Sequence, residues 1–207
     1  INSTYGEGLE VKGDLTFDGG ETYVSSVSDD AINCQGDLTV NNGFVYAFSS
    51  GNDAMDSNGN TNLNGGHVMA ICTKGNPEVA IDANTEEGKK LYINKGTTLV
   101  AYGGLENGYS ASQSVYSFSG TAGSWNALHN GKSFIAAFKA PSNISSFIVS
   151  APSLSSGYKG VKVSGESKCN DVWAADGISG GSSVTLSNYT GGNGGPGGGG
   201  GGRPGGW

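Results

Sequence analysis

Short runs in which apolar and polar residues alternate recur along the first half of the chain. One set of runs lies at positions 15–17, 38–40, 61–63 and 91–93, and a second set lies at 22–24, 45–47, 68–70 and 98–100. Side chains of a β-strand point alternately to its two faces, so this alternation predicts short strands that each bury one face. A turn that contains glycine separates the two runs in every copy.

A third motif joins these runs into one repeating unit. It occupies positions 7–10, 30–33, 53–56 and 79–82, at spacings of 23, 23 and 26 residues. A unit of short strands of this length cannot bury its apolar side alone. Stacked copies bury a continuous column and pair their backbone groups with the coils above and below. The sequence therefore predicts four coils of a parallel β-helix over residues 1–104.

Stacking in this register predicts which side chains face the interior. Two apolar columns are expected there, one of Leu9, Ile32, Met55 and Ile81 and one that includes Leu15, Leu38 and Leu91. The second strand of each coil is expected to place Val24, Ala47, Ala70 and Val100 inside. Its opposite face is expected to carry Tyr23, Tyr46, Met69 and Leu99. The fourth coil has three additional residues within 82–88, which are expected to form a loop.

The period ends after residue 104. Apolar runs at 133–138, 146–149 and 158–163 are separated by turn signals at 130–131, 140–141 and 156–157, which predicts further strands. We expect residues 105–190 to form a β-rich cap or flank, which either covers the strand edges at the end of the helix or packs along the column that begins with Tyr23. Residues 191–207 are mostly glycine and are expected to form a flexible tail. The expected fold class is all-β.

Acidic side chains recur in register within the third motif. Neighbouring coils lie about 4.8 Å apart. One column is therefore expected to contain Glu7, Asp30 and Asp53, and a second to contain Glu10, Asn33, Asp56 and Asp82. Carboxylates at this spacing repel unless a cation neutralises them. Oxygen ligands without His or Cys suit a hard cation, and Ca²⁺ accepts six to eight oxygens in flexible geometry. The pattern predicts Ca²⁺ bound between the coils.

A purely structural role for these residues is the alternative. Asp and Asn are common in turns because their side chains form local hydrogen bonds with the backbone. Turn chemistry alone would accept Ser or Gly equally well, so the recurrence of acids in register favours calcium.

The segments 29–40 and 52–59 resemble bacterial, calcium-containing, right-handed β-helical carbohydrate-binding domains that share their architecture with pectate lyases. The similarity is best over residues 5–104, and the pattern at 176–186 is also similar to the segment after the helix in such proteins. The resemblance implies a right-handed helix in an extracellular or cell-surface, non-catalytic module. Such a module binds polysaccharides, acidic or plant cell-wall glycans among them, with Ca²⁺ in the acidic corners. Val79 replaces the acid of the other copies, which leaves the number of ions open.

Catalysis is not expected. β-Elimination on a uronic-acid polymer requires a basic Lys or Arg beside a calcium-bound carboxylate. The lysines in or near the coils lie in no recognisable catalytic signature: Lys12, Lys74, Lys89, Lys90 and Lys95. His67 and His129 are isolated, so neither a hydrolytic triad nor a zinc site is predicted.

Composition narrows the classes of partner. The formal net charge of −7 argues against a nucleic-acid surface, and no apolar stretch is long enough to span a membrane. The 38 glycines and the 14% of charged residues are unusual for a helical domain. Three cysteines, Cys34, Cys72 and Cys169, permit one disulfide, and the sequence leaves the pairing open.

Four aromatic residues are candidates for stacking on sugar rings, although packing in a core is the simpler expectation for them. They are Tyr23, Tyr46, Trp125 and Trp173. A second hypothesis assigns a structural function. Parallel β-helices can stack end to end, so the chain is also a candidate subunit of a self-assembled extracellular fibre or matrix.

Overall fold

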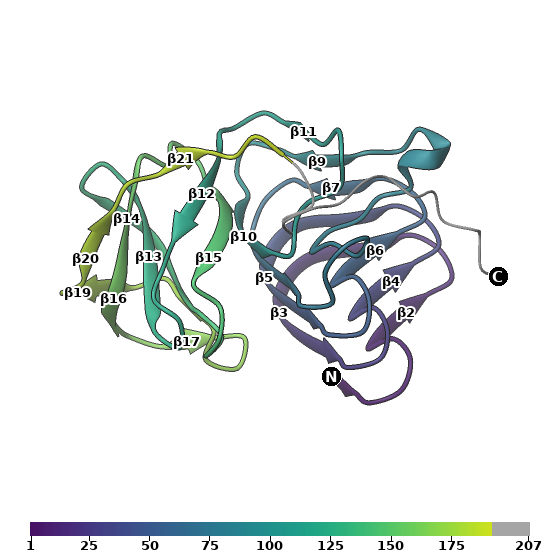
Figure 1. Cartoon of the computed structure of the whole chain (residues 1–207), viewed down its shortest axis with the longest axis horizontal. Coiled ribbons are helices and arrows are strands. Elements are labelled where there is room, and N and C mark those ends of the chain that lie inside the picture. The colour runs from purple at the N-terminus through teal and green to yellow at the C-terminus, as the bar shows by residue number, and fades with distance from the viewer. Residues whose placement is uncertain (192–207) are drawn as a thin grey trace.

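The computed structural model describes residues 1–191 and confirms an all-β protein, with 52% strand and 2% helix. The N-terminal part is a β-solenoid of about three turns, and a second group of strands lies beside it (Figure 1). The predicted tail lies outside the described residues except for Gly191. No helix in the described part of the chain is long and apolar enough to cross a membrane.

The first face of the solenoid is a three-stranded parallel sheet. It consists of β2 (Leu9–Val11), β4 (Ile32–Cys34) and β6 (Met55–Ser57). The register is the predicted one, with Leu9 opposite Ile32 and Ile32 opposite Met55. Single bridges continue this face from Met55 to Ile81 and from Ile81 to Leu105. The fourth copy of the motif thus contributes a bridge to this face, and not a strand.

The remaining two faces belong to one 11-stranded sheet. Its longest strands, β3 (Leu15–Ser26) and β5 (Leu38–Ser49), continue through the corner between the faces. Later coils divide into β7 (Thr61–Leu63) with β8 (His67–Cys72), and β9 (Leu91–Ile93) with β10 (Thr98–Tyr102). The short strands β1 (Asn2–Ser3) and β11 (Ser110–Ala111) pair with β3 and β9. All these pairs are parallel. The 3-10 helix η1 (Thr85–Glu87) lies in the insertion that was predicted as a loop.

The predicted interior is confirmed on the first two faces. Leu38 and Val40 are fully buried, and they share one core cluster with Ile32 and Met55. Leu38 lies between Leu15 and Thr61 in the neighbouring coils.

The predicted register of the third face is wrong by one residue in β10. Val100 lies opposite Met69, and Leu99 lies opposite Val68. Leu99 is therefore inside the solenoid, and Val100 occupies the outward position that was assigned to Leu99. Because both residues are apolar, alternation alone does not fix the register here. The small residue Ala101 continues the interior column of Ala47 and Ala70.

The C-terminal half extends the large sheet with antiparallel strands and adds a second sheet. The extension consists of β15 (Ser146–Ser150), β12 (Val115–Ser119) and β21 (Ser187–Asn188). Strand β15 pairs with β10 and β12, and β12 pairs with β21. The seven-stranded sheet contains β13 (Trp125–Asn130), β14 (Ser133–Lys139), β16 (Ser156–Ser164), β17 (Ser167–Lys168), β18 (Trp173–Ala174), β19 (Gly177–Ser179) and β20 (Ser182–Val184). The turn predicted at 156–157 is wrong, because these residues begin β16 and the turn lies before them, at 151–154.

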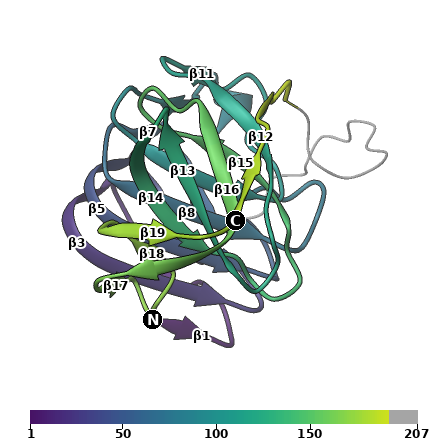
Figure 2. The same cartoon turned by 90° about the vertical axis from the view of Figure 1, so that its left-hand side faces the viewer.

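These C-terminal strands pack along the outward column of the third face, in front of the solenoid in Figure 2. Tyr46, Met69 and Val100 share a buried cluster with side chains from the C-terminal half. The larger of these partners are Phe118, Leu128, Phe138, Phe147 and Trp173. The sheet formed by β3, β5, β8 and β10 thus separates two hydrophobic cores. All three cysteines are buried and free, so the disulfide that their number permits does not form.

Candidate metal site

Three carboxylates meet at the corner where the third face of one coil leads into the first face of the next. Asp30 and Asp53 each lie two residues before a strand of the first face, and Asp56 is the middle residue of β6. Parallel stacking brings one oxygen of each residue within 4.8 Å of the others. The trio combines members of both predicted columns, with Asp30 and Asp53 from the column of Glu7 and Asp56 from the column of Glu10, Asn33 and Asp82.

Two of the three carboxyl groups are almost completely buried. Asp30 is 2% exposed and Asp53 is 1% exposed, whereas Asp56 is half-buried. The backbone N–H of Asp53 donates to Asp30 Oδ1 at 2.9 Å, and the N–H of Val79 donates to Asp53 Oδ1 at 2.5 Å. Each buried carboxyl group therefore accepts a backbone hydrogen bond from the next coil. One acid per coil satisfies a donor at a corner where strand pairing is interrupted.

Burial changes the ionisation of both groups. It is the main cause that raises the pKa of Asp30 to about 8, and the charges of Asp56 and Asp29 add to the effect. Burial likewise raises the pKa of Asp53 to about 9, although its hydrogen bond from Val79 acts in the opposite direction. Without a cation, these two groups keep their protons at neutral pH. A bound cation would favour the ionised form and displace the protons.

The other predicted ligands surround this trio without joining it. Glu7 and Asp82 are close enough to raise the pKa of Asp30 and of Asp53, respectively. Asn33 donates its side-chain amide to Asp30 Oδ2 at 3.2 Å. Glu10 has the predicted register opposite Asn33, but it forms an exposed ion pair with Lys12. The carboxylates of Glu7, Glu10 and Asp82 are not in the group within 4.8 Å.

A ladder of amide side chains at another corner was not predicted from the sequence. Asn41 donates to Asp18 at 2.8 Å, Asn64 donates to Asn41 at 2.9 Å, and Asn94 donates to Asn64 at 2.8 Å. The signal was present, because each of these residues directly follows the first alternating run of its coil. In this ladder one acid is stabilised by an amide, so an acid in register does not by itself indicate an ion. The trio differs because three carboxylates lie together and two of them are buried.

The aromatic candidates for glycan stacking divide into two pairs. Tyr46 is 6% exposed and Trp173 is 0% exposed, so neither ring offers a face to a sugar, and both pack in a core, which was the simpler expectation for them. Tyr23 is half-buried and stacks on Tyr46, with ring centroids 4.7 Å apart and planes at 7°. Trp125 is also half-buried, and Lys139 Nζ lies 5.9 Å from its ring centroid. Of the four residues, Tyr23 and Trp125 are therefore the two that remain partly exposed.

Comparison of the chain with protein-family models, with curated proteins and with solved structures finds no match.

Proposed function

We propose that the protein is a calcium-binding, non-catalytic module that binds acidic polysaccharides at an extracellular or cell-surface location. The trio of Asp30, Asp53 and Asp56 carries this proposal, because its three carboxyl groups lie within 4.8 Å of one another and two of them are buried. Such an arrangement is favourable only if the groups hold protons or share a cation.

The donor set selects the kind of cation. The three grouped residues offer only oxygen ligands, and the neighbouring Asn33, Glu7 and Asp82 belong to the same chemical class. Hard cations prefer oxygen, and Ca²⁺ tolerates irregular coordination by six to eight atoms. One oxygen of Asp30 and one of Asp53 already accept backbone hydrogen bonds. The trio alone therefore does not supply all the ligands of a calcium coordination shell.

An incomplete shell gives the ion a way to bind a glycan. Asp56 is half-buried, so the site is accessible from the side of this residue. Sugar carboxylates are oxygen ligands of the same type as the protein side chains. A calcium ion between the acidic corner and a uronic-acid polymer would bridge two surfaces that otherwise repel.

We propose binding without turnover. The largest effects on the pKa values of Asp30 and Asp53 come from burial, other carboxylates and backbone N–H groups. A lysine or arginine base, which β-elimination would need, is not among them.

We also propose a right-handed winding of the coils, which is the usual hand of connections between parallel strands. In addition, we propose that residues 105–190 act as a cap.

Apolar side chains that are exposed on the first described coil support the alternative function, a subunit of a fibre or matrix. Ile1, Tyr5 and Val27 are 60%, 91% and 55% exposed, and Leu9 and Phe17 are only half-buried. At the other end, β15 already pairs with β10. Assembly through the apolar side chains of this coil is therefore the form of this alternative to test, and negative-stain microscopy would reveal filaments or paired particles.

Affinity electrophoresis through gels that contain polygalacturonate tests the main proposal. We expect calcium to retard the wild-type protein, and both a chelator and the substitution Asp56→Asn to restore free migration. Asp18→Asn is the matched control, since it removes the same charge from the amide ladder and not from the trio. Retardation that is unaffected by the chelator would contradict the proposal, as would the appearance of an unsaturated product.

A further inference from the structure

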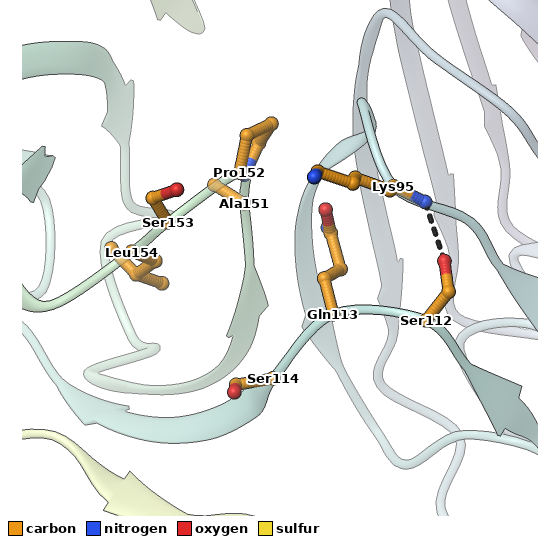
Figure 3. A pocket seen from close by; sticks show the side chains of 8 residues that line it. All are labelled: Lys95, Ser112, Gln113, Ser114, Ala151, Pro152, Ser153 and Leu154. Atoms are coloured by element: carbon orange, nitrogen blue, oxygen red, sulfur yellow. Dashed lines mark hydrogen bonds between the residues drawn. The ribbon is translucent and has the colours of Figure 1, made fainter.

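A small hollow lies where three connections meet, between the solenoid and the C-terminal strands (Figure 3). These connections are the β9–β10 turn with Lys95, the link 112–114 between β11 and β12, and the turn 151–154 between β15 and β16. The cavity volume is about 230 Å³. Sites for drug-sized ligands measure roughly 300–1,000 Å³, so this hollow suits a single small ring.

The inner wall of the hollow is held in place by hydrogen bonds. Gln113 Nε2 donates to Thr97 O at 2.7 Å and to Ser150 Oγ at 2.9 Å, and Gln113 Oε1 accepts from the N–H of Gly96 at 3.3 Å. This single side chain thus joins the solenoid turn to strand β15. The N–H of Lys95 also donates to Ser112 Oγ at 2.7 Å, shown as the dashed line in Figure 3. A wall fixed in this way needs little ordering when a ligand binds.

Lys95 supplies a positive charge to the hollow. Its side chain extends from the β9–β10 turn toward the 151–154 turn in Figure 3. The ion pairs among residues 1–191 engage Lys12, Lys139 and Lys168, but not Lys95. In a chain with a net charge of −7, an ammonium group that is not neutralised beside a preformed hollow points to an anionic ligand.

The opposite wall contains a backbone conformation that is unusual for its residue type. Leu154 N–H donates to Ala151 O at 3.2 Å and closes a turn with Pro152 and Ser153 at its corners. Ser153 has φ of 53°, which is the left-handed region that Gly or Asn adopts more easily. Serine at this position maintains a hydroxyl group at the hollow despite the local strain. Ser112 and Ser114 place two more hydroxyl groups on the other side.

We propose that this hollow binds a hexuronate ring, with its carboxylate on Lys95 and its hydroxyl groups on the serines. An ammonium group, several hydroxyls and a volume for one ring match a sugar that carries one negative charge. The inference rests on the proposed function and adds a binding position for the acidic polysaccharide. It places that position away from the calcium trio, on residues that no sequence pattern indicated.

NMR titration of the ¹⁵N-labelled protein with D-galacturonate, in the presence of a chelator, tests the proposal, with D-galactose as the neutral comparison. We expect shifts in the amides of Lys95, Ser112 and Ser153, and about tenfold weaker binding of galactose, because a charge-assisted hydrogen bond is lost. Lys95→Gln should weaken galacturonate binding by about tenfold for the same reason. Lys90→Gln makes the same change at an exposed site outside the hollow and should leave the affinity within about twofold.

Ser153→Gly separates binding from folding. Glycine adopts the left-handed conformation without strain, so this variant should fold at least as well as the wild type, yet bind galacturonate about threefold more weakly. Equal affinity of the Lys95→Gln and Lys90→Gln variants, or shifts at other surfaces only, would overturn the proposal. The proposed function can fail independently. If galacturonate binds the hollow in chelator but calcium does not promote polymer binding, the hollow is correct and the calcium-dependent function is wrong. If calcium promotes polymer binding but galacturonate does not bind the hollow, the hollow is rejected and the calcium-dependent function stands.

Discussion

A buried aspartate in this solenoid avoids an unpaired charge in one of two ways, by keeping its proton or by sharing a cation. Asp30 and Asp53 have folded-state pKa values of about 8 and about 9, above the ordinary value of 3.8. Without a cation the folded state therefore binds more protons than the unfolded chain across the neutral range. The stability that these two groups contribute is then fully present below the ordinary pKa, and it is lost as pH rises through the folded-state values.

Unfolding by urea in chelator checks this sign. Between pH 7 and 9 we expect the free energy of unfolding of the wild type to fall, by at most about 1.4 kcal/mol per pH unit for each extra proton that the folded state binds. Asp53→Asn should flatten this dependence, since an amide oxygen can still accept the N–H of Val79 and carries no charge. His67 does not change its protonation in this pH range, because burial lowers its pKa and the imidazole stays neutral. Stability that rises with pH in this range would contradict the raised pKa values.

The neighbours Leu38 and Thr39 test the interior register. Leu38 is fully buried and Thr39 is half-buried on the outer side, between Thr16 and Asn62 of the adjacent coils. Leu38→Ala should lower the free energy of unfolding by about 2–5 kcal/mol because it leaves a cavity. Thr39→Ala should change it by no more than about 0.5 kcal/mol. Denaturant titrations of both variants provide the measurement, and a larger loss for Thr39→Ala would reject the register.

At residue scale, the sequence could predict which residues stack in columns, but not how deeply each side chain is buried or which hydrogen bonds it forms. Spacing alone placed Asp30 and Asp53 in one column and Asp56 in the column beside it, opposite Asn33. It could not show that the carboxyl groups of Asp30 and Asp53 accept backbone donors, because that depends on how far each corner is buried. The same limit applies to Tyr46, which alternation placed on the outer face. Only the packing of distant strands on that face makes the ring inaccessible.

Strands were predictable as elements where apolar and polar residues alternate strictly. Strand β5 follows its predicted runs, whereas β10 is shifted by one residue because Leu99 and Val100 are both apolar. Stacked polar residues at the corners then add interactions that no single strand has. The amide ladder runs through four coils and links the ends of the first alternating runs in β3, β5, β7 and β9.

Substitution in the middle of the ladder tests its contribution. Asn64 both donates to Asn41 and accepts from Asn94, so Asn64→Ala removes two hydrogen bonds. Each such bond contributes about 0.5–1.5 kcal/mol net, and the exposure of Asn64 places the expected loss near the lower limit, about 1 kcal/mol in total. Asn107→Ala is the control at an exposed asparagine outside the ladder, with an expected change within about 0.5 kcal/mol. Equal thermal stability of the two variants would contradict a stabilising ladder.

At the scale of the whole molecule, the C-terminal half is held against the solenoid by contacts that no repeat could reveal. Cys169 N–H donates to Glu21 Oε2 at 2.8 Å, and its Sγ lies 3.0 Å from the carbonyl oxygen of Phe44. Trp173 packs beside His67, with ring centroids 5.4 Å apart. These residues are more than one hundred positions apart in the sequence, so periodicity gave no information about their contact.

Trp173 is the residue through which to test this interface. Its side chain is fully buried, and its Nε1 has no hydrogen-bond partner among the described residues. Trp173→Ala should lower the free energy of unfolding by about 3–5 kcal/mol. Trp173→Phe should cost clearly less, since it keeps an aromatic ring and gives up no hydrogen bond. Chemical denaturation distinguishes the two, and an equally large loss for phenylalanine would show that the indole N–H has a partner.

Differential scanning calorimetry with and without calcium tests the central claim, that the acidic corner is a calcium site of the folded protein. A ligand at about one hundred times its Kd stabilises the folded state by about 2.7 kcal/mol. For a chain of this size that corresponds to a rise in Tm of roughly 5–10 °C. We predict this rise for the wild type and for Asp18→Asn, larger at pH 8 than at pH 6 because fewer protons are displaced, and its loss in Asp53→Asn and Asp56→Asn. A wild-type Tm that is the same in excess calcium and in chelator would contradict the account.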